Sequence, residues 1–303
     1  MKNTPTDSDS RLLTQLTGRA LTATHLRDGD HVIKLFHVAV PAAVAHREAA
    51  IVRTVSAAGV RTPAVHEVFT HNGAPAIRFE RCPGTSLLDC LLGDTTQVSA
   101  HAQRFAAAHV KLHAMKADDL PDLAAVLETA IAQSAGRVST SADDHGKRFP
   151  PGPHWLDAQI LNRQETEPIQ EAVNVERISG ADTICHNDFQ PANLLIDAHE
   201  TWILNWLNAA RGAALADVAQ TSLLLRFAPL TVQHRERLPK KWLDIEDLRR
   251  QFHDEYLQTY YRLAPFSTRE LAAWIKVRAM AWPASFPQPY CDEDQPWGDI
   301  QFE

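Results

Sequence analysis

The sequence changes character at "ERCPGTS", residues 80–86. Before this stretch, short apolar clusters such as "HVIKLFHV" and "APAIRFE" are separated by glycine and proline, a pattern typical of short β-strands. After it, "HAQRFAAAHVKLHAMKA" places apolar residues at helical spacing. The pattern predicts an α+β fold, in which a small strand-rich N-terminal part precedes a larger, mainly helical C-terminal part.

One helix is expected within the strand-rich part, because the Ala-rich stretch "AVPAAVAHREAAIVRTVSAAG" ends at a glycine. We expect a flexible arm over residues 1–10, a small lobe over 11–80, a hinge over 81–85 and a helical lobe over 86–303. Clefts between lobes commonly bind ligands. Within the helical lobe, the sequence predicts a loop at 136–153 and helices near 214–227, 244–262 and 268–281.

Charge and cysteine usage limit the classes of partner and compartment. The chain has 30 basic and 37 acidic residues and a formal net charge of -7, which disfavours nucleic acid and favours a neutral or cationic ligand. Its 4 cysteines show no paired C-x-x-C spacing, so neither a zinc cluster nor a disulfide framework is expected. A cytoplasmic protein is the simplest interpretation. No stretch reaches the roughly 18 apolar residues of a membrane span.

The stretch "HNDFQPAN" has the order H-x-D-x-x-x-x-N, formed by His186, Asp188 and Asn193. Phosphoryl transfer requires a carboxylate that orients the attacking hydroxyl and accepts its proton, and an oxygen ligand that holds Mg2+. Asp188 is therefore the candidate catalytic base and Asn193 a candidate metal ligand. Taken alone this spacing is weak, because Asp188 would also suit a turn or a helix cap.

Two further residues support the same chemistry. A phosphate-binding lysine on a strand of the small lobe is usually held by a helix glutamate. Lys34 in "HVIKLFH" and Glu48 in "AHREAAIV" fit these two positions in the right order. A second metal ligand, normally an aspartate, is expected after the next strand, "TWIL", but that position is Asn205. All pieces together, in order, favour a kinase-like protein.

The chain resembles the aminoglycoside phosphotransferase and choline kinase superfamily. The resemblance lies in "LTGRALTATHLRDGDHVIKLF", "AAIVRTVSAAGVRTPAVHEVF", "IRFERCPGTSLLDCLL", "ICHNDFQPANLLID" and "RGAALADVAQTSLLL". It implies a two-lobed protein-kinase-like fold, with ATP or GTP bound near Glu80 and Cys82, together with Mg2+. It also implies a small-molecule hydroxyl acceptor facing Asp188, and an aspartate, Asp217, that braces the catalytic loop. Acceptor specificity and oligomeric state are not encoded in these motifs.

Several positions around the catalytic loop differ from the family pattern. Relatives usually have glycine at positions 187 and 192, histidine at 190, aspartate at 205 and Asp-Pro at 213–214. This chain has Asn187, Ala192, Gln190, Asn205, Ala213 and Ala214 there. An amide is a weaker ligand for Mg2+ than a carboxylate, so we expect reduced metal affinity and reduced activity. The added Cβ atoms at 187 and 192 are expected to constrain the loop backbone.

Two other functions are consistent with these differences. A pseudokinase or binding subunit would hold a nucleotide or ligand without transferring phosphate. A kinase acting on Ser or Thr of a peptide in a natural-product pathway would keep the chemistry but change the acceptor. Nucleotide binding with and without Mg2+ distinguishes the first of these from a working enzyme.

The remaining candidates have simpler explanations. His109 and His113 lie four residues apart, but without a third ligand we interpret them as surface or half-buried residues. Cys185 is expected to be a small buried residue rather than a nucleophile. The acidic C-terminal stretch "CDEDQPWGDIQFE" is expected to be solvated, and the alternative is that it helps to hold a cationic substrate.

Overall fold

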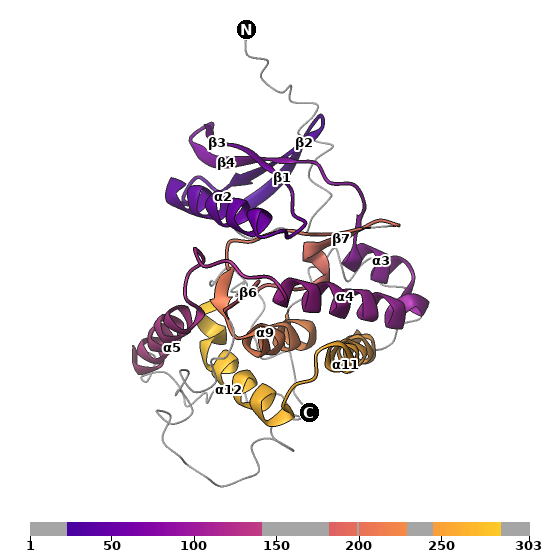
Figure 1. The fold of residues 1–303 in the computed structure, drawn as a ribbon. Helices are drawn as coiled ribbons and strands as arrows, with labels where there is room; N and C mark the ends of the chain where they lie inside the picture. The colour runs from indigo at the N-terminus through magenta and orange to yellow at the C-terminus, as the bar shows by residue number, and fades with distance from the viewer. Residues whose placement is uncertain (1–22, 141–181, 199, 229–244, 286–303) are drawn as a thin grey trace.

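The computed structural model describes residues 23–140, 182–198, 200–228 and 245–285. Its N-terminal part is an antiparallel sheet of order β1-β2-β4-β3, at the top of Figure 1. The strands are β1 (Ala23–Asp28), β2 (His31–Phe36), β3 (Val65–His71) and β4 (Ala74–Glu80). One helix, α2 (Ala42–Ala57), lies against β3 and β4 and shares a small core with the sheet.

The turn between β3 and β4 follows from its sequence. Asn72 and Gly73 both have positive φ values, 47° and 81°. An Asn-Gly pair of this kind makes the two-residue hairpin turn whose twist matches the flanking strands. The sheet face next to α2 carries Phe36 and Ile77, which are 2% and 0% exposed. Burial of these side chains fixes the register in which β2 and β4 present their residues.

The larger part is mainly helical and lies below the sheet in Figure 1. The larger hydrophobic core lies mostly in this part and extends to Ile51, Val52 and Val55 of α2. Nearly every residue of the central helix α9 is buried, and α11 and α12 both pack against α9. The helix α4 lies along α11, and α5 along α12. The helices are α3 (Leu87–Gly93), α4 (Val98–His113), α5 (Leu123–Thr140), α9 (Ala214–Phe227), α11 (Ile245–Leu263) and α12 (Thr268–Ser285).

Short strands connect the sheet to these helices. They form one sheet of order β5-β7-β8 and a second pair, β6 with β9. Gly84, just before β5, has φ 106°, and a Cβ atom there would lie 2.6 Å from the carbonyl oxygen of Ile196 in β7. Only glycine permits this approach. The strands are β5 (Thr85–Ser86), β6 (Thr183–Cys185), β7 (Leu194–Ile196), β8 (Thr201–Ile203) and β9 (Ala210–Gly212).

The structure confirms the predicted α+β class, with a small antiparallel sheet, one associated helix and a larger helical part. The predicted helices near 214–227, 244–262 and 268–281 correspond to α9, α11 and α12. The predicted loop at 136–153 is wrong for residues 136–140, because α5 continues to Thr140 despite Gly136. The low helix propensity of glycine is a weak local preference, which the surrounding structure can override. Residues 141–153 lie outside the described residues.

Among the residues that the structure describes, no helix combines the length and hydrophobicity needed to span a membrane. The division into an arm, a small lobe, a hinge and a helical lobe stays a prediction. Its arm, residues 1–10, falls outside the described part of the chain, as does the acidic stretch at residues 291–303.

Candidate active site

Lys34 and Glu48 form a buried ion pair between β2 and α2. The Nζ atom of Lys34 donates to Oε1 and Oε2 of Glu48 at 2.7 and 2.8 Å. The two residues are 3% and 1% exposed. The pair forms because α2 packs on the sheet with Glu48 on its buried face. It leaves the lysine fixed in position, with one further hydrogen bond to make.

Asp188 lies in the loop between β6 and β7 and is surrounded by amide donors. Asn193, in the short helix Pro191–Asn193, donates through Nδ2 to the backbone oxygen and to Oδ2 of Asp188, at 2.8 and 2.9 Å. Gln190 Nε2 donates to Oδ1 at 2.7 Å. Burial raises the pKa of Asp188 to about 7, although Asn193, Gln190 and Lys34 act in the opposite direction.

Asn205 connects these two groups. Its Oδ1 atom accepts a hydrogen bond from Lys34 Nζ at 2.9 Å, and its Nδ2 atom donates to Asp188 Oδ2 at 3.1 Å. The residue follows β8 and has a φ of 68°, a left-handed conformation that asparagine tolerates better than most residues. A carboxylate at this position could accept from the lysine but could not donate to Asp188.

The side chains around Asp188 contain oxygen groups of the type that a hard cation prefers, but of these only Asp188 can carry a charge. Asn193 and Asn205 turn their amide nitrogens toward Asp188 here, so each would bind Mg2+ through its amide oxygen only after the side chain reorients, while Asp188 offers a carboxylate. The Asn205 oxygen already accepts from Lys34, so a cation there has to compete with an ammonium group. The site therefore fits Mg2+ that brings its own anionic phosphates.

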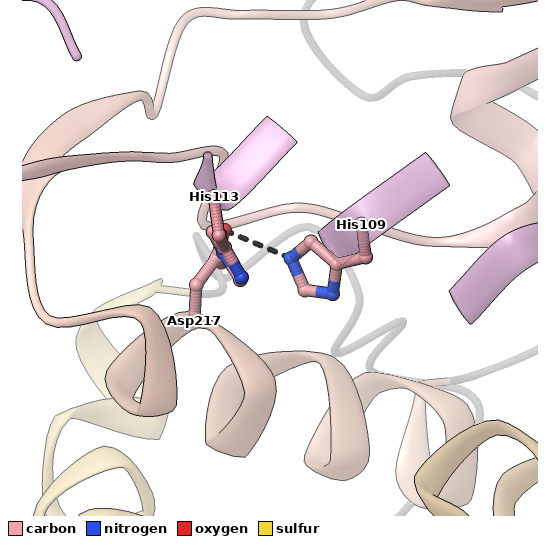
Figure 2. A group of neighbouring side chains, drawn as sticks. All are labelled: His109, His113 and Asp217. Carbon is pink, nitrogen blue, oxygen red and sulfur yellow. Dashed lines mark hydrogen bonds and ion pairs between the residues drawn. The ribbon is translucent and has the colours of Figure 1, made fainter. Parts of the chain in front are cut away.

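Asp217, near the N-terminus of α9, holds the catalytic loop from below. Its Oδ2 accepts from the backbone N–H of His186 at 2.5 Å and its Oδ1 from that of Asn187 at 2.8 Å. His109 and His113 of α4 converge on the same carboxylate, as Figure 2 shows, with their Nε2 atoms 3.2 and 3.4 Å from Oδ2. The bracing role implied by the family resemblance is consistent with these contacts.

The prediction that His109 and His113 are surface or half-buried residues is wrong, because they are 0% and 8% exposed. They lie on the apolar face of α4 together with Phe105 and Leu112, a helical spacing that could have indicated burial. Asp217, remote in sequence, supplies the partner that sequence reasoning missed.

Burial sets the protonation of this cluster. Burial, aided by the neighbouring His113, lowers the pKa of His109 to about 3 against the opposing effect of Asp217. Burial alone would raise the pKa of Asp217, but the hydrogen bonds from His109 and His113 outweigh it and hold that pKa well below its ordinary value. A neutral His109 next to an ionised Asp217 follows at neutral pH.

Asn187, which differs from the glycine of relatives, contributes its side chain to the loop. It keeps a glycine-like backbone, with φ 61°. Its Nδ2 donates to the backbone oxygen of Asn208 at 2.9 Å, and its Oδ1 accepts from the buried guanidinium of Arg278 in α12. Ala192 is not among the residues with positive φ, so its Cβ atom causes no strain of that kind.

Glu80 and Cys82 lie where β4 leads towards β5. Glu80 accepts a hydrogen bond from the backbone N–H of Ala64 at 3.1 Å. Burial, aided by Glu80, raises the pKa of the Cys82 thiol to about 12 against the influence of Arg61, which leaves the thiol protonated. Cys185 is buried, as expected, and burial raises its pKa too. Within the described ranges, no hydrogen bond joins Glu80 or Cys82 to Asp188.

A cavity of about 410 Å³ lies elsewhere, between the end of α2 and the segment after α4, and includes Arg53, Lys116 and Asp119. None of the candidate site residues lines it. The position of this cavity therefore does not connect it with chemistry at Asp188. The candidate site is defined instead by the hydrogen bonds among Lys34, Asn205 and Asp188.

The structure is similar to solved aminoglycoside phosphotransferases. One is APH(3'')-Id from Streptomyces rimosus in complex with ADP and streptomycin, with TM-score 0.55 and 14% identity over 89% of this chain and 94% of that one. Another is an aminoglycoside-3'-phosphotransferase of type VIII, with TM-score 0.52 and 17% identity over 90% and 98%. A third is the gentamicin complex of APH(2")-IIa, with TM-score 0.53 and 13% identity over 94% and 90%.

At these identities the structural likeness establishes the fold, which is that of the protein-kinase-like phosphotransferases. A search of curated proteins found no match. The sequence profile described as "Phosphotransferase enzyme family" matches residues 13–266, which is most of the chain. The chain therefore belongs to the phosphotransferase enzyme family, and its class of activity is phosphoryl transfer to a hydroxyl acceptor.

Proposed function

We propose that the protein transfers the γ-phosphoryl group of ATP or GTP to a hydroxyl of a small molecule, with Asp188 as the catalytic base. The observation that carries this proposal is the continuous network from Glu48 through Lys34 and Asn205 to Asp188. It joins the phosphate-binding lysine to the base within a few ångströms. The neighbour solved with ADP supports use of a nucleotide by this fold.

Each residue then has a defined role. Asp188 orients the acceptor hydroxyl and takes its proton as the oxygen attacks the γ-phosphorus, while the nucleoside diphosphate leaves. Lys34, held by Glu48, steadies the α- and β-phosphates. Asn193 and Asn205 would hold Mg2+ through their amide oxygens, and the bound ion would neutralise charge on the phosphates. Glu80 and Cys82 belong to the segment beside which the nucleotide base is expected.

Activity is proposed to be weaker than in relatives with aspartate at position 205. An amide contributes a dipole rather than a full negative charge, so it holds Mg2+ less tightly. The acceptor is proposed to be a neutral or cationic small molecule, in keeping with the net charge of -7. A cytoplasmic location remains part of the proposal and rests on cysteine usage.

Release of the nucleoside diphosphate tests this function. The unmodified protein is assayed with ATP or GTP and Mg2+ against aminoglycosides, macrolides, choline and sugars, with Asp188→Asn as the matched control. Acceptor-dependent release that Asp188→Asn lowers by at least about a hundredfold is expected for a general base. Absence of turnover with every acceptor, and no gain in Asn205→Asp, would contradict the proposal.

A second candidate is a pseudokinase that binds a nucleotide without transferring phosphate. The observation in its favour is that Asp188 already accepts from Asn193, Gln190 and Asn205, so the network is satisfied without a cation. Such a protein would be stabilised by ATP equally with and without Mg2+. A requirement for Mg2+ in that stabilisation favours the phosphotransferase.

A further inference from the structure

Five buried side chains from three helices form one hydrogen-bonded unit beneath the catalytic loop. Tyr256 and Tyr260 of α11 place their hydroxyls 2.8 and 2.7 Å from Nδ1 of His109 and His113. The two histidines, both on α4, point their Nε2 atoms at Asp217 of α9 (Figure 2). The tyrosines are 0% and 3% exposed. The unit therefore spans α11, α4 and α9 in a buried environment.

The direction of the hydrogen bonds to Asp217 follows from its ionised carboxylate. A carboxylate only accepts, so the Nε2 atoms of His109 and His113 must each carry a hydrogen. Nδ1 of the neutral His109 is then an acceptor, to which the Tyr256 hydroxyl donates, and the Tyr260 hydroxyl is the hydrogen-bond partner of Nδ1 of His113. The carboxylate also accepts from the backbone amides of His186 and Asn187. Two chains of hydrogen bonds, which we call the relay, thus run from α11 to the backbone just before Asp188. Each leads from a tyrosine through a histidine to Asp217.

His109 contacts the loop a second time through its ring. It stacks on Phe189, with ring centroids 3.9 Å apart and an interplanar angle of 10°. Phe189 directly follows Asp188 and also packs against Phe105, with ring centroids 4.6 Å apart. Helix α4 therefore supports the chain on both sides of Asp188, through Asp217 before it and through Phe189 after it. The histidines of α4 are in turn hydrogen-bonded to tyrosines of α11.

A metal centre is the other arrangement that His109, His113 and Asp217 suggest, because their ligand atoms lie within 4.8 Å of one another. Zinc would require both Nε2 atoms without hydrogen and would compete with the His186 amide for Oδ2 of Asp217. Among the described residues, no fourth His, Cys, Asp or Glu joins the group. Hydrogen bonding already accounts for every polar atom, so we take the relay as the working arrangement.

We propose that Tyr256 and Tyr260 are positioning residues, which hold the catalytic loop through His109, His113 and Asp217 and so set the orientation of Asp188. Neither hydroxyl touches substrate in this account. Loss of one lets the corresponding histidine change tautomer or rotate, which weakens the hold of Asp217 on the His186 and Asn187 amides. The nucleotide contacts of Lys34 belong to other elements and are unaffected. The kinetic part of this inference rests on the proposed function.

The test uses Tyr256→Phe, Tyr260→Phe and the matched control Tyr261→Phe, which removes a hydroxyl from a side chain of α11 that is 48% exposed. Phenylalanine preserves the ring in each case. We expect each of the first two variants to lower kcat about tenfold, the scale of one lost hydrogen bond, and to change KM for the nucleotide by less than about twofold. The control should match the unmodified protein.

Hydrogen exchange gives a second readout that needs no turnover. Peptides covering residues 184–190 should exchange faster in Tyr256→Phe and Tyr260→Phe than in Tyr261→Phe, because the His186 and Asn187 amides lose their firm acceptor. If the unmodified protein has no activity with any acceptor, the proposed function fails while this comparison still decides the relay. Equal exchange and equal kcat in all three variants would overturn it.

A pair of His109 variants separates the hydrogen bond from the ring stack. His109→Gln keeps an N–H donor for Asp217 without the ring, whereas His109→Phe keeps a ring against Phe189 without the donor. Slower exchange at residues 184–190 in His109→Gln than in His109→Phe supports the relay, and the reverse order contradicts it. Stoichiometric zinc in the purified unmodified protein, lost in both variants, would replace the relay by a metal site.

Discussion

The side-chain amide of Asn205 donates a hydrogen bond to the Asp188 carboxylate across 3.1 Å. The same amide accepts from Lys34 at 2.9 Å, so one neutral group connects the proposed phosphate-binding lysine to the proposed base. An aspartate at position 205 would bring two carboxylates together unless a cation lay between them. Asn205 thus holds the site together without a metal, and we propose that it does so at the cost of affinity for Mg2+.

Lys34 and Glu48 offer a test that separates stability from nucleotide binding. Lys34→Met leaves the Glu48 carboxylate buried, at 1% exposure, without its partner. We expect a loss of about 3–5 kcal/mol in the free energy of unfolding, measured by urea denaturation. Combining Lys34→Met with Glu48→Leu should recover much of that loss, because an apolar pair replaces an ion pair.

Nucleotide binding should be lost in both of these variants, because each lacks the ammonium group that contacts the phosphates. Titration with ATP and Mg2+ measures it in the variant that keeps its fold, Lys34→Met with Glu48→Leu. Binding by that double variant as tight as that of the unmodified protein would show that Lys34 has no part in holding the nucleotide.

The contacts and backbone conformation of Asn187 predict an unusual order of stability for the glycine and alanine variants at this position. Asn187→Gly keeps the φ of 61° without strain but loses the contacts with the Asn208 carbonyl and the buried Arg278 guanidinium. We expect it to be less stable than the unmodified protein by about 1–3 kcal/mol. Asn187→Ala loses the same contacts and adds left-handed strain of about 1–2 kcal/mol. Thermal unfolding of the three proteins checks the order, and a glycine variant as stable as the original contradicts it.

The pKa of Asp188 predicts how stability changes with pH. Burial raises this pKa from 3.8 to about 7 in the folded protein. Between these two values the folded state binds up to one proton more than the unfolded state. The contribution of Asp188 to stability is therefore fully present below pH 3.8 and is lost as the pH rises to about 7. Asp188 is only half-buried, so water reduces the size of the effect without changing its sign.

Asp188→Asn removes this titration and serves as the comparison. The stability of the unmodified protein should decline more than that of Asp188→Asn from about pH 4 to about pH 7. In the assay, the base must be deprotonated, so activity should rise over the upper part of the same range. Parallel stability curves for the two proteins would show that Asp188 has no raised pKa.

Local sequence patterns were sufficient for much of the fold and part of the site. The alternation of strands and one helix before residue 80 predicted the sheet and α2, and the helical spacing after it predicted α9, α11 and α12. The Lys34 and Glu48 pair could be predicted because a phosphate-binding lysine on a strand is usually held by a glutamate of a helix in the same lobe. Asp188 and Asn193 lie in one short loop, which brings them together whatever surrounds them.

Contacts between distant parts of the chain could not be predicted in this way. Asn205 and Lys34 are 171 positions apart, and only packing of the sheet against the helical part brings them within hydrogen-bonding distance. His109 and His113 were misjudged because their partners, Asp217, Tyr256 and Tyr260, come from helices far along the sequence. Arg278 likewise reaches Asn187 from the last described helix. Such pairings depend on tertiary packing rather than on local preference.

Thermal stabilisation by ATP, measured side by side with and without Mg2+ in the unmodified protein and in Asn205→Asp, tests the central claim most directly. We predict that Mg2+ increases stabilisation of both proteins, and that Asn205→Asp reaches half of its effect at about tenfold lower Mg2+ concentration, because a carboxylate replaces an amide ligand. Without metal, Asn205→Asp should be less stable than the unmodified protein, since it places a second carboxylate beside Asp188. Stabilisation by ATP that is independent of Mg2+ in both proteins would contradict a metal-dependent phosphotransferase.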